Sequence, residues 1–228
     1  MPRTKAAKSF EENWRTVELI SQFTEDRAGR SHEQTAALNQ AALIFCITAW
    51  EGYVEDALKE SATYLAEHCP SYDKLPQEVR RQLELAVTPG KGWGSKSPSG
   101  YYVGDLAGAG WRTLLRTLAT QATEGSNFNT PKSKNVKGLF SSWCGIDVTS
   151  VWSWQNFASP NAAKRLDESI TLRGQIVHTG SKPDGINKAW IDTYGRKNIF
   201  KLVEKTDMLL ISHINSICSN EENPFGDA

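Results

Sequence analysis

The sequence predicts an all-α fold, because apolar residues recur at helical spacing along most of the chain and no stretch alternates apolar and polar residues as strands do. Residues that begin and end helices also stand at the edges of the periodic segments. A chain of 228 residues can bury a substantial core without covalent cross-links. We expect one helical domain over residues 1–220, a bundle with long loops and additional short helices, and an acidic tail at 221–228.

Three helices are expected in the first part of the chain. Apolar residues within an otherwise polar stretch predict an amphipathic helix over residues 5–25. Ser31 or Thr35 caps the next helix, whose middle at residues 41–50 is apolar on nearly every face and therefore belongs in the centre of the core. Pro76 is well placed in the first turn of a third, shorter helix.

The rest of the chain alternates predicted helices with loops rich in Gly, Ser, Asn and Pro. The expected elements are a loop at 89–104, a helix at 106–118, a loop at 125–135, a brief helix at 136–143, an aromatic segment at 147–157 that packs on the core, a helix from Ser159 to Gly180 whose apolar face carries Leu166, Ile170 and Val177, and a final helix at 186–219. Gly180 is the residue type expected just past a helix C-terminus.

Composition narrows the class of protein. The formal net charge is zero, so the whole molecule has no strong field that would attract nucleic acid from a distance. The four cysteines and four histidines are scattered without zinc-ligand spacing, and no secretory signal or membrane-spanning run is recognisable. We therefore expect a cytoplasmic protein with no metal, no cofactor and no membrane association.

The most informative motif is an arginine and a histidine five positions apart, Arg173 and His178, at the end of the helix that precedes Gly180. Histidine titrates near neutral pH, and arginine is the permanent cation best shaped to hold a phosphate. The same spacing recurs at Arg27 and His32, but there it lies in a polar, Gly-containing break between helices. We interpret that second copy as a surface turn.

The Arg173–His178 pair suits metal-independent cleavage of RNA, which carries its own nucleophile in the 2′-hydroxyl. Such a site needs groups that accept and donate protons and a cation facing the phosphorane, and the expected products are a 2′,3′-cyclic phosphate and a 5′-hydroxyl. Five helical residues turn through about 500°, which leaves the two side chains roughly 140° apart. Two copies related by a twofold axis would bring two such pairs into one cleft.

Glu51 interrupts the apolar middle of the second predicted helix. A carboxylate there is unfavourable unless it is paired. We favour an ion pair with Arg173, with hydrogen bonds from backbone donors as the other structural interpretation. The same pairing would orient the guanidinium or the imidazole of the site.

Local positive charge is the remaining sign of RNA binding. The candidate RNA-binding residues are Lys132, Lys134, Lys137, Lys91 and Lys96; a merely solvated loop is the alternative. Trp152 and Trp154 are suited to stacking on bases, but buried packing is the favoured interpretation. His68 and His213 are interpreted as ordinary helix-end residues.

Three segments resemble the HEPN superfamily, whose all-helical domains include many RNases of toxin–antitoxin, CRISPR-associated and phage-defence systems. Residues 47–55 look like the early core helix of the family, residues 167–178 like its catalytic helix, and residues 139–152 like the intervening segment of the RiboL-PSP branch. The resemblance covers most of the chain.

The resemblance implies a dimeric, metal-independent endoribonuclease, a toxin or phage-defence effector, with an antitoxin or another defence component as its partner. Arg173 and His178 occupy the positions of the family's Arg and His, and Glu51 occupies its acidic helix position. Gly174 stands where many members carry Asn, Asp or His. Gly180 stands where one branch has tyrosine.

Two other functions compete with RNA cleavage. The first is a non-catalytic helical module that binds RNA or protein, in which Arg173 and His178 only satisfy core or interface contacts. The second is nucleotide binding by residues 90–97, which would form a phosphate loop if Ser95 were Gly. That motif lacks the preceding strand and the alternating strands and helices that a phosphate loop requires.

Overall fold

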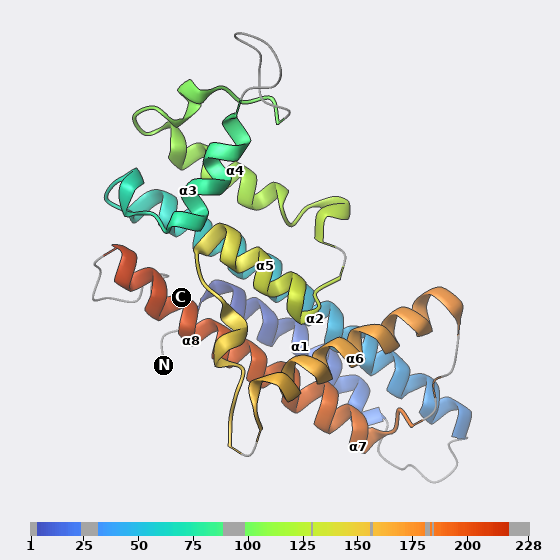
Figure 1. The fold of residues 1–228 in the computed structure, drawn as a ribbon. Coiled ribbons are helices and arrows are strands. Elements are labelled where there is room, and N and C mark those ends of the chain that lie inside the picture. Colours follow the sequence, from blue (N-terminus) through green and yellow to red (C-terminus); the bar gives the residue numbers. More distant parts are fainter. Residues whose placement is uncertain are drawn as a thin grey trace.

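The computed structural model describes residues 4–23, 32–88, 99–128, 130–155, 157–180, 183 and 185–218. Within them the chain is helical throughout apart from connecting turns and one antiparallel bridge between Trp154 and Phe157, as the sequence predicts (Figure 1). The helices are α1 (Lys5–Phe23), α2 (His32–His68), α3 (Gln77–Val87), α4 (Gly110–Gln121), α5 (Ser133–Cys144), α6 (Ser159–Thr179), the short α7 (Lys188–Trp190) and α8 (Asn198–Cys218). A π-helical segment, Ile191–Lys197, joins α7 to α8.

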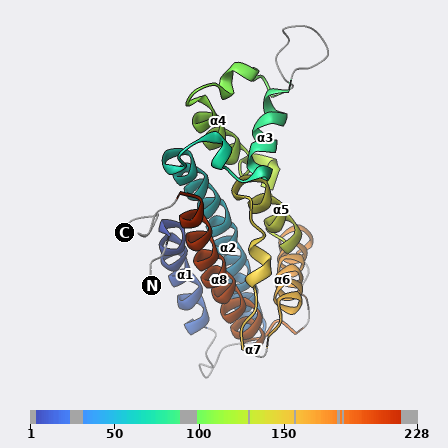
Figure 2. The ribbon, with the colours of Figure 1, turned by 60° about the vertical axis from the view of Figure 1, so that its left-hand side comes forward.

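Helix α2 is the centre of the bundle. Figure 2 shows α1, α2 and α8 side by side along the long direction of the molecule, with α3 and α4 at one end and α6 on one side. Helices α1, α4, α5, α6 and α8 all contact α2. This arrangement agrees with the central place that the sequence predicts for α2, although Phe45 in its apolar middle is 44% exposed.

The core consists of two apolar clusters. The larger one lies between α1, α2, α5, α6 and α8, and the smaller one joins the C-terminal part of α2 to α3, α4 and the end of α8. Trp143 packs against both clusters. Because α2 supplies buried side chains to both, its apolar surface is removed from water along nearly its whole length.

Two fully buried indoles fix the aromatic segment to the core. Trp50 of α2 and Trp152 lie edge to face with ring centroids 5.8 Å apart. The indole N–H of Trp50 donates to the carbonyl of Pro131 at 3.0 Å, and that of Trp152 donates to the hydroxyl of Thr206 at 2.9 Å. The expected packing of this segment on the core is therefore observed, with both indole donors satisfied.

The start of α1 is held by carboxylates from two other helices. Glu60 of α2 accepts hydrogen bonds from the backbone N–H groups of Lys5 and Ala6, each at 3.0 Å. Asp207 of α8 accepts from the backbone N–H and the hydroxyl of Thr4. Anionic acceptors at a helix N-terminus satisfy its free donors and favour its dipole. These contacts tie α1 to α2 and α8.

The structure differs from the sequence predictions at four places. The helix expected at 106–118 is α4, Gly110–Gln121, and Leu106 belongs instead to a separate 3₁₀ turn, Val103–Leu106. The final helix, expected over 186–219, is divided into α7, the π-helical segment and α8. Val177, expected on the apolar face of α6, is 49% exposed, whereas Leu166 and Ile170 are buried as predicted. Helix α5 begins at Ser133, inside the predicted loop at 125–135. Residues 89–98 and the tail at 221–228 lie outside the described residues.

Replacing Gly145 by alanine is expected to destabilise the protein by about 3 kcal/mol, because two penalties combine. Gly145 ends α5 with a positive φ of 73°, and a Cβ there would lie 2.2 Å from the Cβ of Pro76. The matched control is Gly108→Ala: φ is +57° but the space is open, so only about 1 kcal/mol is expected. Urea unfolding measures both variants, and equal losses would contradict the close contact at Pro76.

Candidate functional site

Helix α6 carries the Arg173–His178 motif on a rigid element. The helix begins with Pro160 in its first turn and is anchored through its buried residues Ala162, Leu166, Ser169 and Ile170. It ends at Gly180, which has a φ of +61° and donates its N–H to the carbonyl of Ile176. His178 therefore lies in the last helical turn, where it is exposed.

Glu51 and Arg173 are brought together between α2 and α6. The guanidinium Nη2 of Arg173 lies 3.8 Å from Oε2 of Glu51. The side chains are 26% and 20% exposed, respectively, so the pair is partly shielded from water. This is the pairing that the sequence favours, formed by residues far apart in the chain.

Burial determines the electrostatics of Glu51. Loss of solvent raises the pKa of the Glu51 carboxyl above its ordinary value; the attraction of Arg173 lowers it less, and Glu55 raises it further. The ionised form of Glu51 is thus disfavoured in the fold despite its partner. A carboxylate in this state holds Arg173 in place without strongly stabilising the protein.

Arg173 and His178 do not face one point from a single chain. Helix α6 is regular across both residues, so they are separated by about 7.5 Å along the axis and roughly 140° around it. In the described part of the chain, no hydrogen bond or ion pair links His178 to Arg173 or Glu51. A single α6 therefore points the guanidinium of Arg173 and the imidazole of His178 in different directions.

Open space lies next to both members of the ion pair. Gly52 follows Glu51 and Gly174 follows Arg173, and a Cβ built on either glycine meets nothing within 4 Å. A glycine inside a helix costs roughly 1 kcal/mol relative to alanine, and no internal packing contact accounts for these two. They leave the backbone of α2 and α6 accessible beside the pair.

The predicted lysine patch is only partly free for RNA. Lys137 forms an ion pair with Asp147 at 2.6 Å. Lys134 is exposed and Lys132 is half-buried at the start of α5, while Lys91 and Lys96 lie outside the described residues. Asp167 of α6 accepts hydrogen bonds at 2.7 Å from the backbone N–H and the hydroxyl of Ser133. The start of α5, with its lysines, is thereby fixed beside α6.

An aromatic stack lies beside α6, in the aromatic segment that the sequence predicts at 147–157. The rings of Trp154 and Phe157 stack with centroids 5.0 Å apart, and the guanidinium of Arg165 lies 4.0 Å from the Phe157 ring. Trp152 is fully buried, so the packing interpretation of that residue is correct. Alternating aromatic residues in the sequence indicate such a cluster, but not its cation partner on α6.

Three described histidines lie outside the site. His32 is the exposed first residue of α2, whereas His68 and His213 have structural contacts. His68 stacks on Tyr64 with ring centroids 4.1 Å apart. His213 is hydrogen-bonded through Nε2 to the carbonyl of Cys144 at 2.8 Å. Neither histidine lies with Arg173 or Glu51 in a cluster that the described residues show.

No metal-ligand group was found in the part of the chain that the structure describes, where sets of three or more His, Cys, Asp and Glu side chains were sought. Burial raises the pKa of Cys46 and of Cys144 to about 12, so both thiols stay protonated at neutral pH.

Among the described helices, none combines the length and the apolar character needed to cross a bilayer.

Comparison with known proteins gives one match. The family model described as RiboL-PSP-HEPN matches residues 11–218 of the chain. No curated protein and no solved structure was found to match it. The matched region includes α2 and α6, and with them Glu51, Arg173 and His178.

Replacing Glu51 by glutamine is expected to leave stability unchanged or slightly higher at neutral pH. Because its folded pKa is raised, wild-type Glu51 binds its proton more tightly in the folded state, and stability falls as pH rises from about 4 through the folded pKa. The glutamine variant lacks this loss. Its melting temperature relative to wild type should therefore rise between about pH 4 and pH 7, by roughly 2 °C or less.

The matched control is Glu55→Gln, one turn further along α2. Burial also raises the pKa of Glu55, but its partner is Lys59 at 4.0 Å rather than Arg173. Both variants should show the same sign of pH dependence in thermal melts. A melting temperature of Glu51→Gln that falls relative to wild type as pH rises would contradict the dominance of burial at this carboxyl.

Proposed function

Because this chain belongs to the RiboL-PSP-HEPN family, we propose that it is a metal-independent endoribonuclease whose site contains Arg173, His178 and Glu51. The observation that carries this assignment is the Glu51–Arg173 ion pair at 3.8 Å, which links α2 to α6, the helix that also exposes His178. The pair joins the acidic and the basic residue of the motif across two packed helices, and His178 lies five residues beyond Arg173 on α6. The family supports RNA as the substrate class.

The proposed reaction is an internal transesterification of RNA. The 2′-oxygen forms a bond to the adjacent phosphorus, the bond from phosphorus to the 5′-oxygen breaks, and the products are a 2′,3′-cyclic phosphate and a 5′-hydroxyl. One imidazole accepts the proton of the 2′-hydroxyl or donates a proton to the leaving 5′-oxygen. Arg173 stabilises the negative charge of the phosphorane, and Glu51 positions the guanidinium.

A second copy of the chain is proposed to complete this site. One α6 directs Arg173 and His178 to different sides, whereas a twofold axis would supply a histidine and an arginine from each copy to a common cleft. Exposed apolar side chains on the same two helices support an interface, namely Phe45 on α2 at 44% and Val177 on α6 at 49%. The open space at Gly52 and Gly174 allows close approach.

The biological role is proposed from the family as that of a toxin or phage-defence effector in the cytoplasm. An antitoxin or another component of a defence system would then control it. For RNA binding, Lys134 is proposed first among the described lysines of the predicted patch, because it is exposed, whereas Lys137 is paired with Asp147. Contacts between such a lysine and the phosphate backbone of RNA fix the place of the strand but do not read its sequence.

A non-catalytic RNA- or protein-binding module is the second candidate. The observation that favours it is the position after Arg173, where Gly174 supplies no side chain and open space lies beside the pair. In this case Arg173 would serve only to neutralise Glu51. The cleavage experiment separates the two candidates.

His178→Ala and Arg173→Ala are each expected to reduce RNA cleavage at least 100-fold, because an acid or base contributes about 10²–10⁴ in rate and a fixed cation contributes similarly. The assay incubates the purified protein with total RNA in EDTA and identifies cyclic-phosphate ends. His68→Ala is the matched control and should cleave normally. Unchanged cleavage in both site variants, or none by wild type in any buffer, would contradict the assignment.

Mixing the two inactive variants is expected to restore part of the activity. If the cleft combines residues from two copies, a heterodimer of Arg173→Ala and His178→Ala regains one arginine and one histidine. Unfolding and refolding the mixture allows exchange, and cleavage should reach at least tenfold above either variant alone. A protein that is monomeric by light scattering while cleaving at full rate would contradict the shared site.

A further inference from the structure

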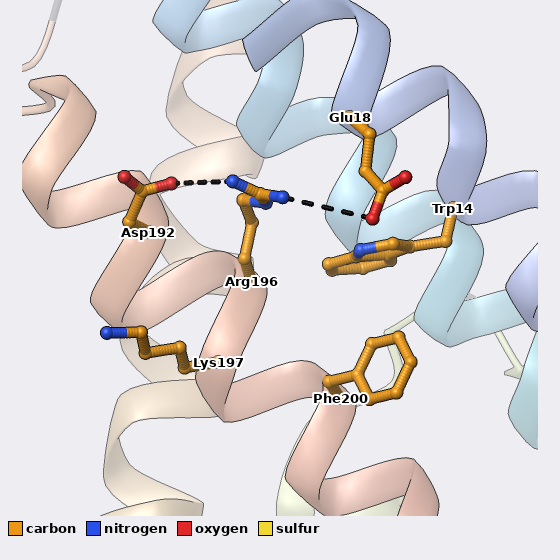
Figure 3. A pocket seen from close by; sticks show the side chains of 6 residues that line it. All are labelled: Trp14, Glu18, Asp192, Arg196, Lys197 and Phe200. Atoms are coloured by element: carbon orange, nitrogen blue, oxygen red, sulfur yellow. Dashed lines mark hydrogen bonds and ion pairs between the residues drawn. The ribbon is translucent and has the colours of Figure 1, made fainter. Parts of the chain in front are cut away.

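A hollow of about 360 Å³ lies between α1 and the π-helical segment, and neither Glu51 nor Arg173 lines it. It is lined by Trp14 and Glu18 of α1, by Asp192, Arg196 and Lys197 of the π-helical segment, and by Phe200 at the start of α8 (Figure 3). Its size lies within the range of small-ligand sites, which is about 300–1,000 Å³. None of these residues belongs to the proposed cleavage site.

Two aromatic rings form one wall of the hollow. Trp14 and Phe200 meet edge to face, with centroids 5.8 Å apart. Trp14 is 3% exposed and held by Phe10 at 5.0 Å, whereas Phe200 is half-buried and so reaches the opening. Figure 3 shows both rings on the same side of the hollow, below the side chain of Arg196. The wall is therefore apolar, and the Phe200 ring is its more accessible part.

The guanidinium of Arg196 spans the opposite side. Its Nη1 lies 3.0 Å from Asp192 and its Nη2 lies 3.9 Å from Glu18, so the planar group is held from both ends. The Nε of Arg196 is buried and has no hydrogen-bond partner. Because this Nε is shielded from solvent, the polar groups that the hollow offers to a ligand are the Nη donors of Arg196 and the acceptor lone pairs of Glu18 and Asp192.

The charges select a class of ligand. The lining holds two cations and two carboxylates, so its interior does not suit an anion such as free phosphate. A flat, uncharged heteroaromatic group can pack against Phe200, stack on the guanidinium plane and exchange hydrogen bonds with both kinds of charged group. A nucleobase has this combination of properties.

The Arg196 ion pairs also have a structural role, because they join the π-helical segment to α1. That role does not require the hollow that remains beside them. The π-helical turn itself is stabilised by close packing, since Gly195 lies against Cys46, whose Sγ is 3.3 Å from the position of an added Cβ. Such π turns are rare and occur frequently at functional sites.

We propose that this hollow binds the base of a single nucleotide, with Phe200 and Arg196 as its stacking surfaces and Glu18 and Asp192 as hydrogen-bond acceptors. Lys197 is exposed at the rim, where its ammonium suits the phosphate attached to the nucleoside. The source of the nucleotide is either a free mononucleotide or an unpaired residue of an RNA strand. The π-helical segment also contacts α2 and α6, the helices of the proposed cleavage site.

The test measures the binding of AMP, adenosine and an uncleavable 2′-O-methyl RNA hexamer to the full chain. Calorimetry gives the affinities, and saturation transfer to the adenine protons shows contact with the base. Arg196→Gln should weaken AMP binding at least tenfold. Lys197→Gln should weaken AMP at least threefold and leave adenosine unchanged. Arg15→Gln, an exposed residue of α1 outside the hollow, is the matched control and should bind as wild type does.

The outcomes separate the two sources and the two proposed sites. Binding of AMP and adenosine indicates a free nucleotide; binding of the hexamer alone, weakened in Arg196→Gln, indicates an RNA residue. The proposed cleavage is not required, because none of the three probes can be cleaved. Where Arg196→Gln melts early, Lys197→Gln carries the test. No binding by any probe, or binding lost in Arg173→Ala but retained in both pocket variants, overturns the assignment.

Discussion

Burial of α2 constrains every other part of the fold. Its 37 residues supply side chains to both apolar clusters, and α1, α4, α5, α6 and α8 pack around it. Burial of apolar surface is the main favourable term in folding, so a helix with few free faces determines where its neighbours lie. Directional contacts then fix their register, as Glu60 does for the start of α1 and Trp50 does for the segment at Pro131.

One side of α2 is only partly buried, and the candidate site forms there. Glu51 lies on the side of α2 that α6 covers incompletely, and its raised pKa shows that loss of solvent outweighs the attraction of Arg173. A partly buried ion pair of this kind adds little to stability but limits the positions of both side chains. The apolar packing of α2 and α6 thus holds an arginine whose charge is only partly neutralised.

Local sequence signals determine much of this fold but not all of the site. The existence of α1 and α2 follows from apolar spacing, and the ends of α6 follow from Pro160 and Gly180. The Glu51–Arg173 pair follows from the need to compensate a carboxylate in an apolar helix. Spacing indicates which residues share a helix face but not whether a neighbouring element covers that face. The exposure of Val177 could therefore not be predicted from spacing. The hollow between α1 and the π-helical segment depends on a π turn that tertiary packing determines. No local sequence pattern predicts such a turn.

The position of Gly174 decides how much of the proposed chemistry the three named residues must supply. Members of the superfamily that the sequence resembles often carry Asn, Asp or His after the arginine. Here the position is open, with nothing within 4 Å of an added Cβ. Arg173 is restrained by Glu51, and His178 lies roughly 140° around the helix. In the proposed reaction, charge stabilisation would then rest on Arg173 and proton transfer on His178, and the approach of a second α6 would determine whether both reach one phosphate.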